Sequence, residues 1–516
     1  MSNIKILWAD DEIDLLKPQI MFLQTKGYDV TAVSNGHDAI EQAREQSFDV
    51  VFLDESMPGI TGLETLPRIK AINNNLPVVM ITKNEAENVM ESAIGAQITD
   101  YLIKPVNPNQ VLLTLKKIID SQRLVSAATT SKYQQEFMKI FADIQSTSDY
   151  HEWIELYKKL VYWELELESN QAIEMREVLA NQKADANTEF CKFIVKNYAD
   201  WIQGKQKAPT MSHTLFRNKI FPKLEANVPN FVIVIDNLRF DQWKIIQPII
   251  SECFRFLQED TFFSILPTST HYSRNAIFAG LMPLDIEKRF PHLWKNDVDE
   301  GGKNLYEDDF LADQLRRTGN DMKYKYIKIT NNNDGNSLVD NITNLLTNQL
   351  NVIVYNFVDM LSHARTEMEV LKELASDEAA YRSITRSWFL HSPLWQALRR
   401  LEDRKINLIF TTDHGTVRVQ RPSKVVGDRE TTSNLRYKHG RNLQYNNKEV
   451  LEFRRPSDVK LPTPNVSSTF IFAKEDTFFA YPNNYNYYVN YFRNTFQHGG
   501  ISLEEIIVPI AHFSSK

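Results

Sequence analysis

The segment Asp49-Val-Val-Phe-Leu-Asp54-Glu-Ser-Met-Pro58-Gly59 runs from consecutive apolar residues into an acidic turn. Within the first 120 residues, four more apolar runs alternate with helical stretches: Ile4–Ala9, Asp29–Val33, Pro77–Thr82 and Asp100–Ile103. This alternation is typical of a parallel sheet that is covered by helices on both faces. The sequence therefore predicts an α/β fold, with its site at the carboxyl ends of the strands.

Polar residues end or follow four of these five runs, at the positions where the strands are expected to end. Asp10 and Asp11 follow the first run, Asp54 the third and Lys104 the fifth, and Thr82 is the last residue of the fourth. A divalent cation requires clustered carboxylate oxygens. An aspartate beside such a cation can also accept a phosphoryl group, because the metal and a lysine neutralise the developing charge. The pattern predicts a metal-assisted phospho-acceptor.

The order and spacing of these residues resemble the receiver domain of two-component response regulators, over residues 1–120. Thr82 follows Asp54 by 28 residues, and Lys104-Pro105 follows 22 residues later. The resemblance implies that Asp54 is phosphorylated and that Lys104 contacts the phosphate. The residues that would bind Mg²⁺ are Asp10, Asp11, Asp54 and, through its backbone carbonyl, Ser56. Thr82 and Tyr101 would form the switch pair that reorganises on phosphorylation.

Residues 121–225 have a different pattern, in which the β-type runs disappear. Glycine and proline are almost absent until Gly204 and Pro209. Trp153–Trp163 and Thr188–Ile202 mix apolar and charged residues at intervals of three and four, as amphipathic helices do. We expect a helical connector. No Lys/Arg-rich recognition helix is evident, although a helix-turn-helix stays compatible with the sequence.

Residues 226–516 return to β/α alternation, which predicts a second α/β domain after the connector. The expected strands are Phe231–Ile235, Thr261–Leu266, Asn351–Phe357, Ile406–Thr411 and Ile501–Ile510. Aspartates and histidines again gather next to these strands: Asp236, Asp359, His363, Asp413, His414 and His498. Imidazole and carboxylate together suit Zn²⁺ or Mn²⁺ better than Ca²⁺ or Mg²⁺, and six such ligands are enough for two ions.

A nucleophile candidate lies in Ile265-Leu-Pro267-Thr-Ser-Thr270, where both Thr268 and Thr270 carry a hydroxyl. A threonine attacks poorly unless a metal or a base lowers the pKa of its hydroxyl. Two divalent ions carry four positive charges, and three aspartates with one alkoxide carry four negative charges. Charge balance therefore favours a deprotonated threonine in such a site.

This ordered set resembles the alkaline-phosphatase superfamily, and within it the PglZ domain, over about 290 residues. The family's nucleophile spacing matches Pro267-x-x-Thr270, so Thr270 is preferred over Thr268, and the absence of Cys or Ser there disfavours a sulfatase. By analogy, Asp359, His363 and His498 would hold one zinc ion. The other ion would be held by Asp236, Asp413, His414 and Thr270. The implied reaction is in-line displacement at phosphorus by a metal-dependent phosphodiesterase.

The order of the two regions, a receiver followed by a PglZ domain, resembles the response regulators associated with type IX secretion. That similarity implies a sensor histidine kinase as partner, dimerisation on phosphorylation and contact with a sigma factor. A second hypothesis is a non-catalytic signalling scaffold that acts by binding such partners. A third, a DNA-binding transcription factor, would need a recognition helix in the connector.

Composition limits the compartment and the substrate. The net charge of −7 excludes a general polyanion-coating protein, and two cysteines cannot build a disulfide framework. An early acidic cluster argues against a signal peptide, and no run reaches the ~18 apolar residues of a membrane span. We expect a cytoplasmic protein with no membrane insertion. Residues 416–455 hold ten Lys/Arg against four acids, which favours nucleotide or oligonucleotide substrates, with Arg436 and Arg441 as candidate contacts.

Overall fold

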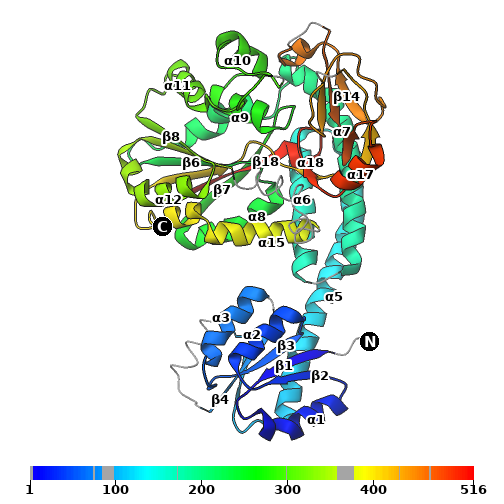
Figure 1. Ribbon diagram of the computed structural model, residues 1–516, viewed down its shortest axis with the longest axis vertical. Coiled ribbons are helices and arrows are strands. Elements are labelled where there is room, and N and C mark those ends of the chain that lie inside the picture. The colour runs from blue at the N-terminus through cyan, green and yellow to red at the C-terminus, as the bar shows by residue number, and fades with distance from the viewer. Residues whose placement is uncertain are drawn as a thin grey trace. The chain divides into compact units, whose positions relative to one another are not determined.

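The computed structural model describes residues 4–73, 76–83, 98–170, 173–297, 299–356, 377–428, 431–463 and 467–516, with the backbone alone at 120–125 and 173–174. The chain divides into two compact units (Figure 1). The first contains the residues up to Lys132 and a short stretch at Asn170, and the second contains the rest. Asp359 and His363 lie outside the described residues.

The first unit is built on a parallel sheet of five strands in the order β2-β1-β3-β4-β5. The strands are β1 (Lys5–Ala9), β2 (Asp29–Val33), β3 (Val50–Asp54), β4 (Val78–Thr82) and β5 (Asp100–Ile103). The helices are α1 (Lys17–Thr25), α2 (Gly36–Glu45), α3 (Gly62–Ile72) and α5 (Pro108–Ser146), with a 3-10 turn, η1 (Ile13–Leu16). The order reverses between β1 and β3, which is where such sheets place their site.

Alternation along the strands produces two apolar layers, one on each face of this sheet. Leu7 and Leu53 pack with α2 and α3, whereas Trp8 and Phe52 pack with α1 and α5. Helix α3 begins at a capping box, in which Thr61 and Glu64 each satisfy a backbone N–H of the other. The expected doubly wound α/β fold of the first segment is confirmed.

The helical region that follows is also confirmed, as α5 is followed by α6 (Tyr150–Ser169) and α7 (Ile173–Ile202). Helix α6 buries residues at helical spacing, among them Trp153, Tyr157, Leu160 and Leu167. Short turns lead from α7 to the next sheet: η2 (Ser212–Thr214), a π turn η3 (Phe216–Ile220) and η4 (Phe221–Lys223). No helix in the described part of the chain is both long and apolar enough to cross a membrane.

The second unit contains a mixed sheet of six strands in the order β7-β18-β10-β6-β9-β8. They are β6 (Asn230–Ile235), β7 (Phe254–Phe263), β8 (Tyr324–Ile329), β9 (Leu350–Tyr355), β10 (Asn407–Thr411) and β18 (Ile507–Ser515). Strands β10, β6, β9 and β8 run parallel, while β18 is antiparallel to its neighbours β10 and β7. The expected α/β class of this segment is confirmed.

Helices of the second unit lie beside this sheet and beside the small sheets of the same unit, as Figure 1 shows. In chain order they are α8 (Phe240–Cys253), α9 (Thr270–Ala279), α10 (Pro283–Arg289), α11 (Glu307–Arg317), α12 (Asn332–Asn341), η5 (Ile342–Thr347), α15 (Glu378–His391), α16 (Pro393–Arg399), η6 (Pro456–Val459), α17 (Tyr485–Phe492) and α18 (Leu503–Ile506). Helix α8 packs on β7 and β18, and α15 packs on α8.

Small sheets connect the loops that follow β10 and precede β18. Strand β11 (Val417–Arg418) pairs with β17 (Phe496–Gln497), and β12 (Arg421–Lys424) pairs with β16 (Thr477–Ala480). Strand β15 (Thr469–Ala473) lies between β13 (Tyr437–Gly440) and β14 (Val450–Phe453). The β11–β17 pair brings His414 and His498 to adjacent loops.

The expected strand Ile501–Ile510 is wrong in its first half. Leu503–Ile506 form helix α18, because Ser502 accepts a hydrogen bond from the backbone N–H of Glu505 and caps a short helix. Strand β18 begins only at Ile507. Strand β8 was not expected, since Tyr324-Lys-Tyr-Ile-Lys-Ile329 is a half-exposed edge strand with lysines along it.

Candidate functional site

The first candidate site lies at the carboxyl ends of β1 and β3. Asp10 and Asp54 are buried, and the Lys104 ammonium lies 2.9 Å from a carboxylate oxygen of each. Burial, assisted by the negative charge of Asp10, raises the pKa of Asp54 to about 6. Burial alone would lower the pKa of Lys104, but its two carboxylate partners raise it. The structure thus brings together three of the expected residues.

The remaining expected residues of this site surround that trio. Carboxylate oxygens of Asp10, Asp11 and Glu12 lie within 4.8 Å of one another, a grouping that could hold a cation. Ser56 is exposed in the turn two residues after Asp54. The sequence did not indicate Glu12 as a member of this cluster, although its position directly after the acidic pair was a usable signal.

The expected switch pair is split between a buried and an exposed position. Thr82 is buried, and its hydroxyl donates a hydrogen bond to Glu55. Tyr101 lies on β5 and is 39% exposed. The contact of Thr82 with Glu55, the residue after Asp54, links the end of β4 to the candidate phospho-acceptor loop.

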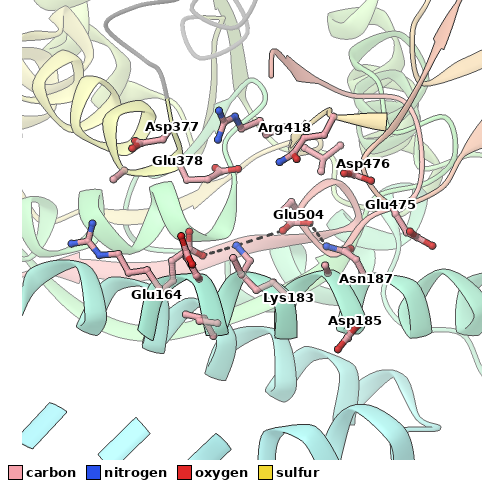
Figure 2. A pocket seen from close by; sticks show the side chains of 18 of the residues that line it. Glu164, Lys183, Asp185, Asn187, Asp377, Glu378, Arg418, Glu475, Asp476 and Glu504 are labelled. Atoms are coloured by element: carbon pink, nitrogen blue, oxygen red, sulfur yellow. Dashed lines mark hydrogen bonds and ion pairs between the residues drawn. The ribbon is translucent and has the colours of Figure 1, made fainter. Parts of the chain in front are cut away.

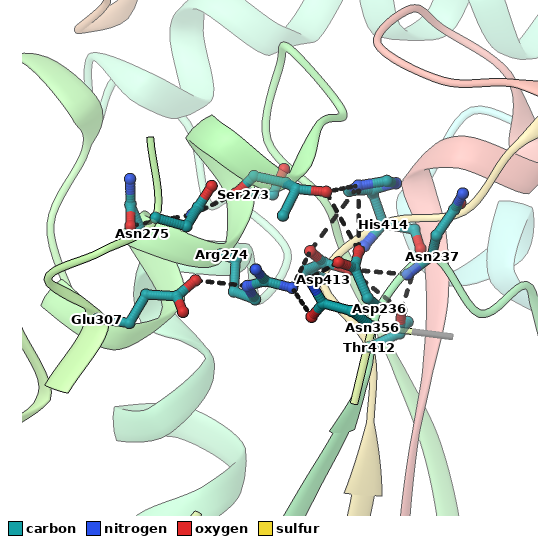
Figure 3. A network of polar contacts seen from close by, with 12 residues as sticks. Asp236, Asn237, Ser273, Arg274, Asn275, Glu307, Asn356, Thr412, Asp413 and His414 are labelled. Atoms are coloured by element: carbon teal, nitrogen blue, oxygen red, sulfur yellow. Dashed lines mark hydrogen bonds and ion pairs between the residues drawn. The ribbon is translucent and has the colours of Figure 1, made fainter. Parts of the chain in front are cut away.

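The second candidate site lies where β6 and β10, neighbouring parallel strands, end (Figure 3). Asp236 directly follows β6, Asp413 and His414 follow β10, and Thr270 opens helix α9. The Thr270 hydroxyl lies 3.0 Å from His414 Nε2 and 3.2 Å from Asp236 Oδ1. Residues that are 34 and 144 positions apart in the sequence therefore meet around one hydroxyl oxygen.

The ring of His414 is fixed by a backbone carbonyl. Its Nδ1 lies 3.1 Å from the carbonyl oxygen of Gly415, which can only accept a hydrogen bond. Nδ1 therefore carries the proton in the neutral ring, and Nε2 offers its lone pair towards Thr270. Gly415 permits this close packing, because a Cβ there would lie 2.0 Å from the carbonyl oxygen of Glu504.

Two buried aspartates in contact make this site electrostatically unusual. Burial would raise the pKa of Asp236, but the Arg274 guanidinium, 2.6 Å away, holds it below its usual range. Burial and the negative charge of Asp236 raise the pKa of Asp413 well above its usual range. Two adjacent carboxylates that are out of contact with water are unfavourable unless a cation compensates them.

The donor set fits a transition-metal ion. Oxygen and nitrogen atoms of Asp236, Asp413 and His414 lie within 4.8 Å of one another, and all three side chains are buried. Oδ1 of Asp413 accepts hydrogen bonds from the backbone N–H groups of Asn237 and His414. Within the described ranges, the buried Oδ2 of Asp413 accepts no hydrogen bond, and Arg274 Nη1 and His414 Nε2 lie 3.9 and 3.8 Å from it. A carboxylate oxygen in this situation is well placed to bind a cation.

Of the three other expected zinc ligands, only His498 lies among the described residues. Asp359 and His363 fall in the undescribed stretch 357–376. His498 stacks on His414, with ring centroids 4.3 Å apart, and its Nδ1 lies 3.2 Å from the carbonyl oxygen of Thr268. His498 thus belongs to the same cluster as His414.

The two candidate threonines occupy different environments. The Thr268 hydroxyl is fully buried, donates to the carbonyl oxygen of Gly500 and accepts from the N–H of Gly499. Its hydrogen bonds therefore hold the loop that contains His498. Thr270 is only partly buried and faces Asp236 and His414. This difference agrees with the preference for Thr270.

The expected substrate contact by Arg436 does not agree with its position. Arg436 is fully buried, with Glu505 2.7 Å from its Nη2, and it also donates to the carbonyl oxygen of Thr477. Its guanidinium anchors helix α18 to the small sheets. Arg441 is exposed on the surface and lies 3.8 Å from Asp428.

Sequence reasoning missed Arg274, which contacts Asp236, and Glu307, which contacts Arg274 from the other side (Figure 3). A signal for Arg274 was present, because it follows Thr270 by four residues on a helix and therefore lies on the same face. Glu307 begins α11 and carries no comparable local signal.

A separate cavity of about 690 Å³ lies between helices α6 and α7 and the loops near β11 (Figure 2). Its wall contains a chain of polar contacts in which Lys183 pairs with Glu164 and Glu504, and Asn187 donates to Glu504. Among the described residues, Asp236, Thr270, Asp413, His414 and His498 are not part of its lining.

Three family models match the chain. The model for the BREX system PglZ alkaline phosphatase-like domain matches residues 215–513, more than half of the chain. The model for the PorX response regulator linker domain matches residues 123–202, and the response regulator receiver model matches residues 6–116. The chain belongs to the PglZ family and is a two-component response regulator of the PorX type, with a receiver domain, this linker and a PglZ domain.

The curated relatives are similar to part of the chain. The transcriptional regulatory protein ZraR of Escherichia coli K12 is 34% identical over 136 residues, which are 26% of this chain and 31% of that protein. ResD of Bacillus subtilis is 31% identical over 118 residues, 23% of this chain and 49% of its own. The chain thus spans about a third to a half of the length of these relatives.

The solved structures that are similar to the chain also match only a part of it, about a quarter. A receiver domain protein from Clostridium thermocellum is 28% identical, with 23% of this chain and 98% of that chain covered and a TM-score of 0.23. The chemotaxis regulator CheY4 of Vibrio cholerae is 29% identical over 23% of this chain and 99% of its own, with a TM-score of 0.22.

Proposed function

We propose that this response regulator is phosphorylated on Asp54 and that its PglZ domain is a metal-dependent phosphodiesterase with Thr270 as nucleophile. The observation that carries the proposal is the position of the Thr270 hydroxyl, 3.0 Å from His414 Nε2 and 3.2 Å from Asp236 Oδ1. Nucleotides or oligonucleotides are the proposed substrates, on the basis of the excess of basic residues after His414.

Two zinc or manganese ions are the proposed cofactors of this domain. Asp236, Asp413 and His414 would hold one ion beside Thr270, and Asp359, His363 and His498 would hold the other. When bound, such ions supply Lewis-acid stabilisation of phosphoryl oxygens and lower the pKa of a coordinated hydroxyl. In the receiver domain, Mg²⁺ is the proposed ion, with Asp10, Asp11, Asp54 and the carbonyl of Ser56 as ligands.

The protein's own groups prepare Thr270 for attack. Asp236 Oδ1 lies within hydrogen-bond distance of the hydroxyl and can accept its proton, whereas the lone pair of His414 Nε2 would be used by the bound ion. Thr270 is also the first residue of a ten-residue helix, whose N-terminal N–H groups favour negative charge. In-line displacement at phosphorus would then form a bond from the Thr270 oxygen to phosphorus and break one P–O ester bond, so that one alcohol leaves with a proton. Water would then hydrolyse the phosphothreonine ester, which releases the phosphomonoester and restores the Thr270 hydroxyl.

The regulatory part of the proposal extends the resemblance to response regulators associated with type IX secretion. A sensor histidine kinase would donate the phosphoryl group to Asp54, Thr82 and Tyr101 would respond, and the phosphorylated chain would form a homodimer. Contact with a sigma factor, a role in type IX secretion and a cytoplasmic location belong to the same proposal. So does a division into domains at residues 1–120, 121–225 and 226–516.

Hydrolysis of bis-p-nitrophenyl phosphate in the presence of Zn²⁺ tests the catalytic part. Thr270→Val preserves the shape of the side chain and removes the hydroxyl, whereas Thr270→Ser keeps a hydroxyl. We expect turnover by the native chain and by Thr270→Ser, and none by Thr270→Val. Equal turnover by native protein and Thr270→Val would refute Thr270 as the nucleophile, whereas no turnover by any of the three would refute catalysis and favour a binding role for the PglZ domain.

A further inference from the structure

Arg274 is a buried cation directly behind the candidate nucleophile. It lies one helical turn after Thr270 on α9, and its side chain is 1% exposed. Nη1 donates to Asp236 Oδ2 at 2.6 Å and to Asn356 Oδ1 at 3.2 Å, while Nε donates to Glu307 (Figure 3). A buried guanidinium with both ends occupied has one orientation, because its planar fork is rigid.

Glu307 is itself fixed by three donors. Besides Arg274, the Tyr326 hydroxyl donates to it and the Lys328 ammonium lies 2.9 Å from its Oε2. Burial would raise the pKa of Glu307, but Arg274 and Lys328 hold it below its usual range. Glu307 therefore anchors Arg274 as a carboxylate, and a buried ion pair of this kind holds a defined geometry.

The same group of residues also holds the backbone of the nucleophile. Lys328 Nζ donates to the carbonyl oxygen of Asn304 at 2.7 Å, and Asn304 Nδ2 donates to the carbonyl oxygen of Thr270 at 3.0 Å. Asp236 and Thr270 are thus both connected to strand β8 and the start of α11. The two residues that must meet for the proposed chemistry share one support.

The two oxygens of Asp236 are divided between different partners. Oδ2 accepts from Arg274, while Oδ1 faces the Thr270 hydroxyl. We infer that Arg274, anchored by Glu307, is a positioning residue that orients Asp236 so that Oδ1 remains available to Thr270 and to a metal ion. This inference rests on the proposed function, in which Thr270 is the nucleophile. The effect of Arg274 on metal binding can be measured without turnover.

An alternative reading makes the opposite prediction. Arg274 Nη1 lies 3.9 Å from Asp413 Oδ2, so its positive charge could stand where a cation belongs. Removal of a competing charge would then strengthen zinc binding. Removal of a positioning residue would weaken it, because a residue that orients a metal ligand typically contributes 10- to 100-fold to affinity or activity.

Zinc affinity, measured by competition with a chromophoric chelator, separates the two readings. We expect Arg274→Gln and Glu307→Gln each to weaken zinc binding by about 10- to 100-fold. The double variant should lose no more than Arg274→Gln alone, since the two residues act as one unit. Arg289→Gln is the matched control, because Arg289 is partly exposed and pairs with Asp313 away from the site. It should bind zinc as the native chain does.

Unchanged or tighter zinc binding by Arg274→Gln would overturn the inference. If Arg274→Gln fails to fold, judged by its thermal melt, Arg274→Lys replaces it. Lysine keeps the charge but cannot contact Asp236 and Glu307 together, so native affinity in Arg274→Lys would also overturn the inference. Zinc binding without hydrolysis in the native chain would refute the proposed function alone, whereas a native chain that binds no zinc would refute both.

Discussion

Arg436 and Glu505 form a buried ion pair far apart in the sequence, with no exposure of either side chain. Removal of one partner leaves an uncompensated charge out of contact with water, which costs about 3–5 kcal/mol. We expect Arg436→Gln to lower the free energy of unfolding by that amount in urea denaturation. Arg454→Gln is the control, because Arg454 is 78% exposed in its pair with Glu452 and should leave the free energy of unfolding close to that of the native chain. Equal effects of the two variants would contradict this account of Arg436.

His213 links stability to pH. Burial lowers the pKa of its imidazole to about 4 from an ordinary value of 6.5. The unfolded chain therefore binds a proton near pH 6.5 before the folded chain does, and stability is lost as pH falls from 6.5 towards 4. We expect His213→Gln to reduce the loss of unfolding free energy between pH 7 and pH 5 by on the order of 1–2 kcal/mol. The same pH dependence of unfolding free energy in native protein and His213→Gln would refute this role of His213. His391→Gln is the control, because His391 is exposed at the end of α15 and its replacement should leave the pH dependence unchanged.

The conformation of the loop after β10 requires glycine at position 415. A Cβ at Gly415 would lie 2.0 Å from the carbonyl oxygen of Glu504, so the loop that carries His414 would have to shift. We expect Gly415→Ala to destabilise the fold by about 1–3 kcal/mol and to impair zinc binding. At Gly302, a Cβ would meet only the side chain of Leu305, which is 66% exposed, so Gly302→Ala should be close to neutral. Thermal melts and zinc titrations of the two variants check the contrast.

The local sequence pattern predicted most strands and helices correctly. It failed where contacts between distant residues determine the secondary structure. Short apolar runs predicted the five parallel strands of the first unit, most clearly the central strands β1, β3 and β4, which are buried on both faces. The run Ile501–Ile510 looked like one strand, but the Ser502 cap and the Arg436–Glu505 pair make its first half helical. Strand β8 escaped notice because an edge strand keeps polar residues.

The same contrast applies to the candidate sites. Asp10, Asp54 and Lys104 could be predicted to meet, since parallel strands end at one edge of a sheet. So could Asp236, Asp413 and Thr270, once each was assigned to a strand end. The contact between Arg274 and Glu307 could not, because it depends on how α11 packs against α9. Nothing in the spacing of 33 residues indicates that contact.

Phosphorylation of Asp54 is expected to control the assembly of the chain. Lys104 already contacts Asp54, and Thr82 contacts the adjacent Glu55, so a phosphoryl group would change the partners of both residues. We expect beryllofluoride with Mg²⁺ to double the mass measured by light scattering for the native chain, and to leave Asp54→Ala monomeric. An unchanged mass of the native chain would contradict dimer control by phosphorylation.

The central claim is that Asp236, Asp413 and His414 hold a transition-metal ion beside Thr270. Elemental analysis of purified protein, after equilibration with zinc and removal of loosely bound ions, tests this claim most directly. The account predicts two zinc ions per native chain and at least one fewer in Asp413→Asn, which keeps the Oδ1 acceptor and replaces the Oδ2 ligand with an amide nitrogen. Equal zinc content in the two proteins, or none in the native chain, would contradict it.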